Sequence, residues 1–280
     1  SLLRNENNGS RPVESLASID EPGTPDLPGA VSPVGSKFRG SEIESILGVS
    51  NPQPAILGTA GSSDRAVVFP DPGNAPATQS LVGLPADAAP HGVAYYGSDN
   101  ALISDFSRSR IHVLQISTAT LVSTINTAPA AYNGTGTIAV APSLTVAFAI
   151  GSNNSLKVIQ APFGPGSAIS SVALPGTVAS YQTQAIVFNN AGRAFVYHTT
   201  GISVLDAPYT SIAFTIPVSN SSSGAIGISP DGNTLLATTF SNQVRIYQAP
   251  FSAGSTASLL TIPGGSSLDG IMVAPNGNHA

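Results

Sequence analysis

The sequence predicts an all-β protein, folded as a β-propeller of five four-stranded blades. Three observations lead to this prediction. Hydrophobic residues alternate with a period of two, turns containing Gly or Pro interrupt them every few residues, and one unit recurs along the chain. With 28 Gly and 23 Pro among 280 residues, the chain has the turn-forming content that such a fold requires.

The repeat is most regular between residues 224 and 264, which read as four short strands and therefore have the size of one propeller blade. A Ser-Pro-Asp-Gly turn at residues 229–232 separates the first two strands. Proline presets φ in such a turn, and glycine accepts the positive φ that a side chain disfavours. The predicted strands are residues 225–228, 234–238, 244–247 and 257–262.

Further copies of this unit align on the residue that precedes the first turn. These residues recur every 40 to 48 positions, at Tyr95, Val140, Phe188, Ile228 and Val273. The loop before the fourth strand also recurs, as Ala-Pro-Phe at 161–163 and 249–251 and as Ala-Pro-Tyr at 207–209. Chance similarity is the alternative explanation, but spacing, turn chemistry and strand pattern recur together.

One unit carries a longer pattern, with PHGVA at 90–94, NALISD at 100–105, IHVL at 111–114 and TATLVSTI at 118–125. This stretch resembles the YVTN-type β-propeller repeat of bacterial surface-layer and periplasmic proteins. The literal Tyr-Val-Thr-Asn is absent, and Leu-Ile-Ser-Asp at 102–105 stands in its place. The resemblance implies a propeller, and because that family hosts several roles it implies no particular function.

The two ends of the chain suggest how the ring closes. Residues 270–278 read as a first strand and turn, whereas residues 54–60, 65–69 and 78–84 read as second, third and fourth strands. We therefore expect one blade to be shared between the N- and C-terminal parts, which would remove open sheet edges. The alternative is a longer chain with further blades downstream.

Residues 1–50 are expected to form an extended N-terminal arm, and residues 51–280 the propeller. The arm is rich in Pro, Gly and Ser and holds seven of the fifteen acidic residues, so it becomes ordered only against its own propeller or another subunit. Ser41 and Glu44 form a capping-box pattern that predicts a short helix near 42–48. Its apolar residues Ile43, Ile46 and Leu47 are the predicted partner-binding residues.

Composition excludes several functions and indicates a compartment. A net charge of −5 with 9% charged residues excludes a basic surface for nucleic acid or anionic lipid. The absence of Cys excludes disulfides and thiolate metal sites, and no apolar run approaches membrane-spanning length. No metal or cofactor motif occurs in the sequence.

Lack of Cys and a first residue other than Met indicate an exported protein, extracellular or periplasmic, whose signal peptide has been removed. Four N-x-S/T sequons, at Asn8, Asn133, Asn153 and Asn220, support glycosylation weakly.

Ligands of propellers usually lie on the axis, where the first strands converge. Four positions before each aligned residue, the sequence places His91, Gly136, Gln184, Gly224 and Asp269, which are expected to line one end of the axial channel. His91 and Asp269 are the weak catalytic candidates, because a His–carboxylate pair can orient a general base. The alternative is that both simply line a wet pore.

These observations leave three functions open. The leading interpretation is a non-enzymatic, exported propeller that acts as an interaction or scaffold subunit of a larger assembly, with the arm latching a partner protein. The second is a lactonase- or hydrolase-type enzyme with an axial pocket around His91 and Asp269. The third is a glycan-binding propeller that stacks sugars on the tyrosines Tyr95, Tyr96, Tyr132, Tyr181 and Tyr209.

Overall fold

Twenty β-strands form five four-stranded antiparallel sheets in the computed structural model of the chain. The structure describes residues 43–46, 55–59, 65–69, 80–105, 108–127, 137–151, 154–178, 184–218, 223–239, 241–265, 268 and 270–273. Every regular element within these ranges is a strand, which confirms the all-β prediction. Within them, no helix is long and apolar enough to span a membrane.

Each sheet is formed by four strands that follow one another in the sequence. The first contains β1 (Ile43–Ile46), β2 (Ala55–Thr59), β3 (Arg65–Phe69) and β4 (Ser80–Gly83). The second contains β5 (Pro90–Tyr96), β6 (Asn100–Asp105), β7 (Arg110–Gln115) and β8 (Thr120–Asn126). The third contains β9 (Ile138–Val140), β10 (Val146–Gly151), β11 (Ser155–Gln160) and β12 (Ile169–Ala173). The fourth contains β13 (Ile186–Phe188), β14 (Ala194–His198), β15 (Gly201–Leu205) and β16 (Phe214–Pro217). The fifth contains β17 (Ser223–Ile228), β18 (Thr234–Thr239), β19 (Gln243–Gln248) and β20 (Ser258–Thr261).

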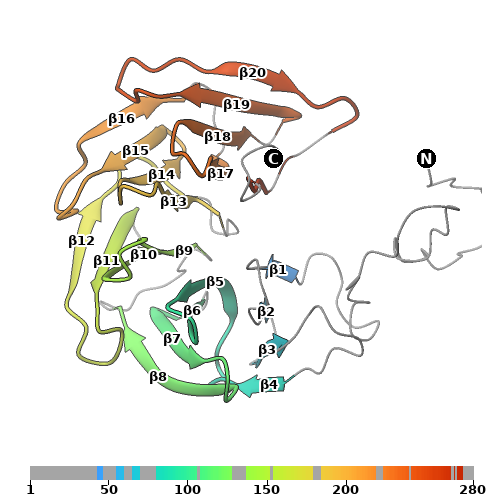
Figure 1. The fold of residues 1–280 in the computed structure, drawn as a ribbon, viewed down its shortest axis with the longest axis vertical. Coiled ribbons are helices and arrows are strands. Elements are labelled where there is room, and N and C mark those ends of the chain that lie inside the picture. Colours follow the sequence, from blue (N-terminus) through green and yellow to red (C-terminus); the bar gives the residue numbers. More distant parts are fainter. Residues whose placement is uncertain are drawn as a thin grey trace, which may run out of the picture.

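The five sheets are arranged around a common centre like the blades of a propeller (Figure 1). The first strand of each sheet, β1, β5, β9, β13 or β17, lies nearest the centre, and the fourth strand lies on the outer rim. Among the described strands the series does not close, because none of them lies between the fifth sheet and the first at the right of Figure 1, and we call this space the opening. The fold therefore has two terminal sheets, each with one face directed towards the opening.

Successive sheets pack through one recurring arrangement. A large residue on the second strand, Leu102, Phe148 or Phe195, faces the following sheet and is completely buried there. The following sheet covers it with smaller residues at alternate positions of its own second strand, such as Ala147 and Ala149 over Leu102. Side chains on one face of a strand recur every second residue, so this pairing of large and small residues fixes the register between sheets.

The repeated Ala-Pro-aromatic loops attach each sheet to the one before it. Phe163 packs edge-on against Tyr96 of the second sheet, with ring centroids 4.8 Å apart. Phe251 packs in the same way against Phe195 of the fourth sheet, at 5.2 Å. Edge-to-face geometry is the favoured arrangement of aromatic pairs. The sequence repeat is therefore a repeat of inter-sheet contacts.

The prediction of a short helix near residues 42–48 is wrong. Residues 43–46 are strand β1, and the propeller therefore begins at Ile43 rather than at residue 51. The i, i+3 spacing of Ile43 and Ile46, which resembles a helix, fits a bulged strand equally well. The bulge inserts one residue, so these two residues pair with Thr59 and Leu57, which are two positions apart on β2.

The sharing of one blade between the two ends of the chain is not confirmed. Strand β1 pairs with β2 and supplies the inner strand that the C-terminal residues were expected to provide. Of those C-terminal residues, 270–273 form no strand. They instead lie beside Gly227 on β17, the inner strand of the fifth sheet. Residues 274–280, like residues 1–42, lie outside the described part of the chain.

Candidate functional site

Three of the five predicted axial residues lie in the described part of the chain. His91 belongs to β5 and is buried, Gly224 belongs to β17 and is buried, and Gln184 precedes β13 and is half-buried. The side-chain Oε1 of Gln184 accepts a hydrogen bond of 3.1 Å from the backbone N–H of Ile271. Gly136 and Asp269 lie outside the described residues. The predicted pairing of His91 with Asp269 is therefore untested.

Next to His91 and Gly224, the inner strand of each sheet is joined to the second strand by a hydrogen bond to a side-chain hydroxyl. Both β5 and β17 carry a bulge at this point, which frees a backbone N–H from the strand ladder. In the second sheet the N–H of Gly92 donates to Ser104 Oγ at 2.9 Å, and in the fifth the N–H of Ala225 donates to Thr238 Oγ1 at 2.8 Å. The hydroxyl on the second strand thus has the same structural role in both sheets.

His91 is held in an environment that disfavours charge. Burial lowers its pKa from the ordinary value of 6.5 to about 4. The imidazole is therefore neutral at physiological pH, as a general base must be, but its burial keeps it away from solvent and from a substrate. These features favour a structural role for His91.

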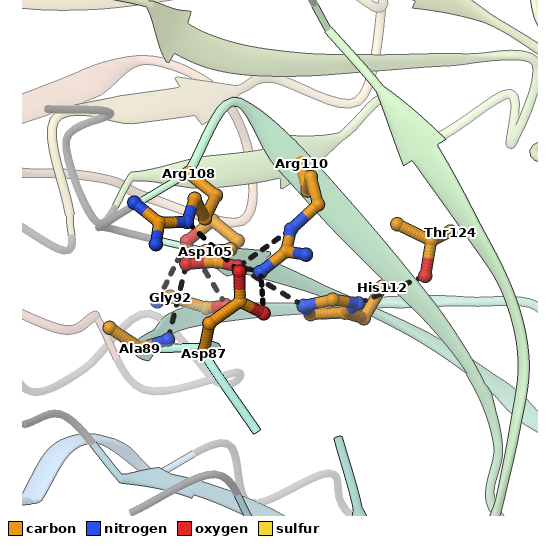
Figure 2. A network of polar contacts seen from close by, with 9 residues as sticks. Asp87, Ala89, Gly92, Asp105, Arg108, Arg110, His112 and Thr124 are labelled. Atoms are coloured by element: carbon orange, nitrogen blue, oxygen red, sulfur yellow. Dashed lines mark hydrogen bonds and ion pairs between the residues drawn. The ribbon is translucent and has the colours of Figure 1, made fainter. Parts of the chain in front are cut away.

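The sequence did not predict the densest polar cluster, which lies at the β6–β7 turn of the second sheet (Figure 2). At its centre, the buried carboxylate of Asp105 accepts hydrogen bonds from Arg110 Nη2 at 2.7 Å and Nε at 3.0 Å. The N–H of Ala89 donates to its other oxygen at 3.1 Å. Arg110 also bonds Asp87 at 3.0 Å, and Asp87 holds Arg108 at 3.1 Å.

The charge of Asp105 is stabilised although the residue is buried. Burial raises the pKa of this carboxyl group, but hydrogen bonds from His112, Arg110 and the Ala89 N–H more than offset burial and leave the pKa below its usual value. Asp105 is therefore an anion that ties the end of β6 to β7 and to the loop before β5. In the sequence, Asp105 is visible only as the end of the repeat segment NALISD at 100–105, which does not distinguish it from other strand-end residues.

His112 extends this cluster to the outer strand. Its Nε2 lies 3.4 Å from Asp105 Oδ2, and its Nδ1 lies 3.1 Å from Thr124 Oγ1 on β8. The residue is completely buried. A carboxylate, an imidazole and a hydroxyl in series resemble a nucleophile-activating relay. Here Arg110 already neutralises the carboxylate, which favours a structural link across three strands.

A second buried histidine, His198 at the end of β14, contacts Ser203 but does not activate it as a nucleophile. Its Nε2 lies 2.7 Å from Ser203 Oγ, while the backbone N–H of Thr200 donates to its Nδ1 at 3.3 Å. Because Nδ1 accepts that bond, the neutral ring carries its proton on Nε2 and donates it to Ser203. Burial lowers the pKa of His198 to about 4, so the ring stays neutral. His198 therefore cannot act as a base towards the Ser203 hydroxyl.

Metal and sugar sites gain no support within the described ranges. No group of three or more His, Asp or Glu residues there could hold a metal ion. Of the five tyrosines considered as sugar platforms, Tyr132 and Tyr181 lie outside those ranges. Tyr96 packs against Phe163, and Tyr209 is buried against Phe148 with ring centroids 5.1 Å apart. Tyr95 is half-buried and packs on the core between the first two sheets.

The fifth sheet exposes the outer part of the face that the second, third and fourth sheets bury. Leu260 on β20 has the register position of Ile125, Val172 and Ile216 on the preceding outer strands. Those three residues are 1%, 7% and 0% exposed, whereas Leu260 is 49% exposed. We call this surface the open face, formed by Leu236, Val244, Ile246 and Leu260, of which Leu236 and Val244 are buried, Ile246 is half-buried and Leu260 is exposed. Residues 271–273 lie beside its inner edge at Gly227, and exposure is greatest at its outer edge.

The outer rim is the second apolar surface. The five outer strands, β4, β8, β12, β16 and β20, contain no charged residue. Of the six large hydrophobic residues recorded as exposed in the described chain, four lie on these strands: Leu81, Val122, Leu259 and Leu260. Proteins usually protect edge strands with charges, prolines or a cover, because an exposed edge pairs with other strands. The outer strands are therefore uncharged, and three of them, β4, β8 and β20, expose large aliphatic side chains.

Comparison with known proteins supports the propeller fold and goes no further. No known sequence family matches this chain, and neither does any characterised protein sequence. Hydrazine synthase of Kuenenia stuttgartiensis is similar in structure, with a TM-score of 0.69 at 14% identity over 89% of this chain and 75% of that chain. Streptogramin B lyase gives 0.66 at 16% identity over 86% and 76%, respectively. The Cps50 (Swd1) β-propeller domain of Myceliophteria thermophila gives 0.62 at 11% identity over 80% and 73%. Likeness at such low identity establishes the β-propeller fold alone.

Proposed function

We propose that this propeller is a non-enzymatic interaction subunit of a larger protein assembly, held to its partner through the outer rim. The observation that carries this proposal is the uncharged set of outer strands with Val122 and Leu259 exposed by 58% and 56%. An extended segment of a partner can add to such an edge as a further strand, so that backbone hydrogen bonds give affinity and alternate side chains give specificity.

The N-terminal arm contributes a latch in this proposal. Residues 1–42 precede β1 and carry six acidic and four basic residues, which suits them to a partner surface that offers charged groups of both signs. We further propose that the protein is exported and is related to the YVTN-type repeat proteins, because it lacks Cys and carries the repeat pattern at 90–125. Neither the enzymatic nor the glycan-binding alternative has a supporting observation within the described residues.

The test is the mass of the tagged protein recovered from the organism that makes it, measured by light scattering coupled to mass spectrometry. We expect a complex with a partner at fixed stoichiometry, and we expect the rim variant Val122→Lys/Leu259→Lys to be recovered alone. Leu144→Lys is the matched control, because Leu144 is 44% exposed but lies in a turn outside the outer strands. This control variant should retain the partner.

Two results would overturn the proposal. If the unaltered protein is recovered as a monomer at physiological concentration, it is not an assembly subunit. If the rim variant retains its partner as well as the control does, the outer strands are not the interface. Deleting residues 1–42 in the same experiment tests the latch separately, and we expect a weaker complex with a faster off-rate.

A further inference from the structure

The open face of the fifth sheet has the chemistry of a buried surface. Leu236, Val244, Ile246 and Leu260 share the positions that contact the next sheet in the second, third and fourth sheets. Between residues 234 and 265 the only charged residue is Arg245. Arg245 pairs with Ala237, which belongs to the core shared with the fourth sheet, so it faces away from the opening. The inner part of this surface is already buried, and its exposed outer part at Leu260 suits an uncharged, aliphatic cover.

The arm supplies one segment of that composition. Residues 27–36, LPGAVSPVGS, are the longest uncharged run between residue 1 and β1, and Leu27, Ala30, Val31 and Val34 are aliphatic. Pro28 and Pro33 restrict the backbone to extended conformations, which reduces the entropy lost when such a segment is laid on a surface. The remainder of the arm carries a charge at least every six residues and suits an uncharged surface less well.

The position of the segment favours docking within one chain. Only residues 35–42 separate Val34 from Ile43, the first residue of β1. The first sheet borders the opening on one side and the fifth sheet borders it on the other (Figure 1). Eight linking residues reach at most about 28 Å when fully extended. A tether of this length gives an effective concentration in the millimolar range, above that of any second copy in dilute solution.

We propose that residues 27–34 of the arm lie on the open face of the same chain and cover Leu260, in the place that a further sheet would occupy. This fixes the base of the arm on the propeller, so that residues 1–26 extend from a defined point. The inference deepens the proposed function, since the projecting part is the latch, but the docking itself does not depend on a partner.

Single-cysteine labelling tests the proposal directly, because the chain contains no Cys. Leu260→Cys reports on the open face, and Val122→Cys is the control on an equally exposed outer strand of another sheet. Each is labelled with a small maleimide at low micromolar concentration, with and without residues 1–42. We expect Leu260→Cys to react at least tenfold more slowly than the control in the full chain, and at the same rate after truncation. Adding Val31→Asp to the full chain should also release the protection.

Several outcomes would overturn the proposal. Equal labelling rates in the full chain would mean that the face is uncovered. Protection that survives truncation would assign the cover to a second copy if it is lost on dilution, and to another segment if it is not. Hydrogen exchange of β20 amides with Leu260 intact provides a second reading, and we expect faster exchange after truncation. If the protein is a monomer and Leu260→Cys is protected in the full chain, this inference stands and the proposed assembly role is wrong.

Discussion

Leu260 and Ile216 occupy the same register position in neighbouring sheets, yet Ile216 is completely buried and Leu260 is 49% exposed. The difference arises because the fifth sheet covers the fourth, whereas no described sheet covers the fifth. Two equivalent residues thus distinguish the repeating interior of the propeller from its terminal surface.

This relationship predicts unequal effects of truncating the two side chains. Ile216→Ala should lower the free energy of unfolding by about 2–4 kcal/mol, because it leaves a cavity between two sheets. Leu260→Ala should cost less than about 1 kcal/mol in a chain that lacks residues 1–42, where the proposed cover is absent, and more than this in the full chain. Urea denaturation followed by circular dichroism measures both. A cost of Leu260→Ala that approaches that of Ile216→Ala would show that Leu260 is covered in solution.

Asp105 should be the most sensitive charged residue of the second sheet. Asp105→Asn removes the anion that Arg110 and His112 contact, and we expect a loss of about 3 kcal/mol because a buried charge pair is broken. Asp87→Asn is the control. Asp87 is half exposed, so losing its bonds to Arg108 and Arg110 should cost much less stability than Asp105→Asn does. Equal urea midpoints for the two variants would contradict the central role of Asp105.

The stability of the protein should decrease as the pH falls from about 6.5 to 4. His91 and His198 have pKa values lowered to about 4 by burial, so in this window the unfolded chain binds protons that the folded chain does not. Each residue then removes about 1.4 kcal/mol of stability per pH unit. The stabilisation from Asp105 begins to be lost as the pH falls through the usual carboxyl range, where the unfolded chain takes up a proton, and the loss is complete only below the lowered pKa of the folded state.

The measurement is the free energy of unfolding at several pH values, compared with that of the double variant His91→Gln/His198→Gln. The double variant should be less stable at neutral pH, where it loses buried hydrogen bonds, but its stability should change less between pH 6.5 and 4. An unchanged slope would show that neither histidine is neutral and buried as described.

Gly224 is required because its backbone packs closely against Thr238 on β18, not because a ligand in the axial channel needs the space. A Cβ at this position would overlap the backbone carbonyl of Thr238, which cannot move without disrupting β18. Gly224→Ala should therefore destabilise the protein by about 2 kcal/mol or more. Gly254→Ala is the control, since a Cβ there meets only Ser252 Oγ at 3.8 Å. Thermal melts compare the two, and similar melting temperatures would argue against this account of the axial glycine.

Much of the architecture could be predicted from the sequence because the blade is a local structure. Period-two alternation, the Ser-Pro-Asp-Gly turn and the repeated Ala-Pro-aromatic loops each specify contacts between residues close in the chain. The fifth sheet accordingly has the strands expected of it within a few residues. Prediction failed at residues 43–46, where a bulged strand imitates the apolar spacing of a helix.

The polar sites could not be predicted because they depend on residues that are far apart. Asp105 and Asp87 look like ordinary turn residues, and only the antiparallel pairing of β6, β7 and β8 places Asp105, His112 and Thr124 in one series. The sequence instead directed attention to His91, which the structure buries.

The all-β class, the repeating four-stranded unit and the lack of charge on the outer strands follow from residue type and short-range periodicity, and they can be read from the chain alone. Which of five similar sheets keeps an exposed outer edge depends instead on how whole sheets pack around the centre. Leu260 and Ile216 are equivalent as residues, and their exposure differs only because burial depends on what packs against a side chain. That information is set by the number and order of the sheets around the centre, not by the repeat itself.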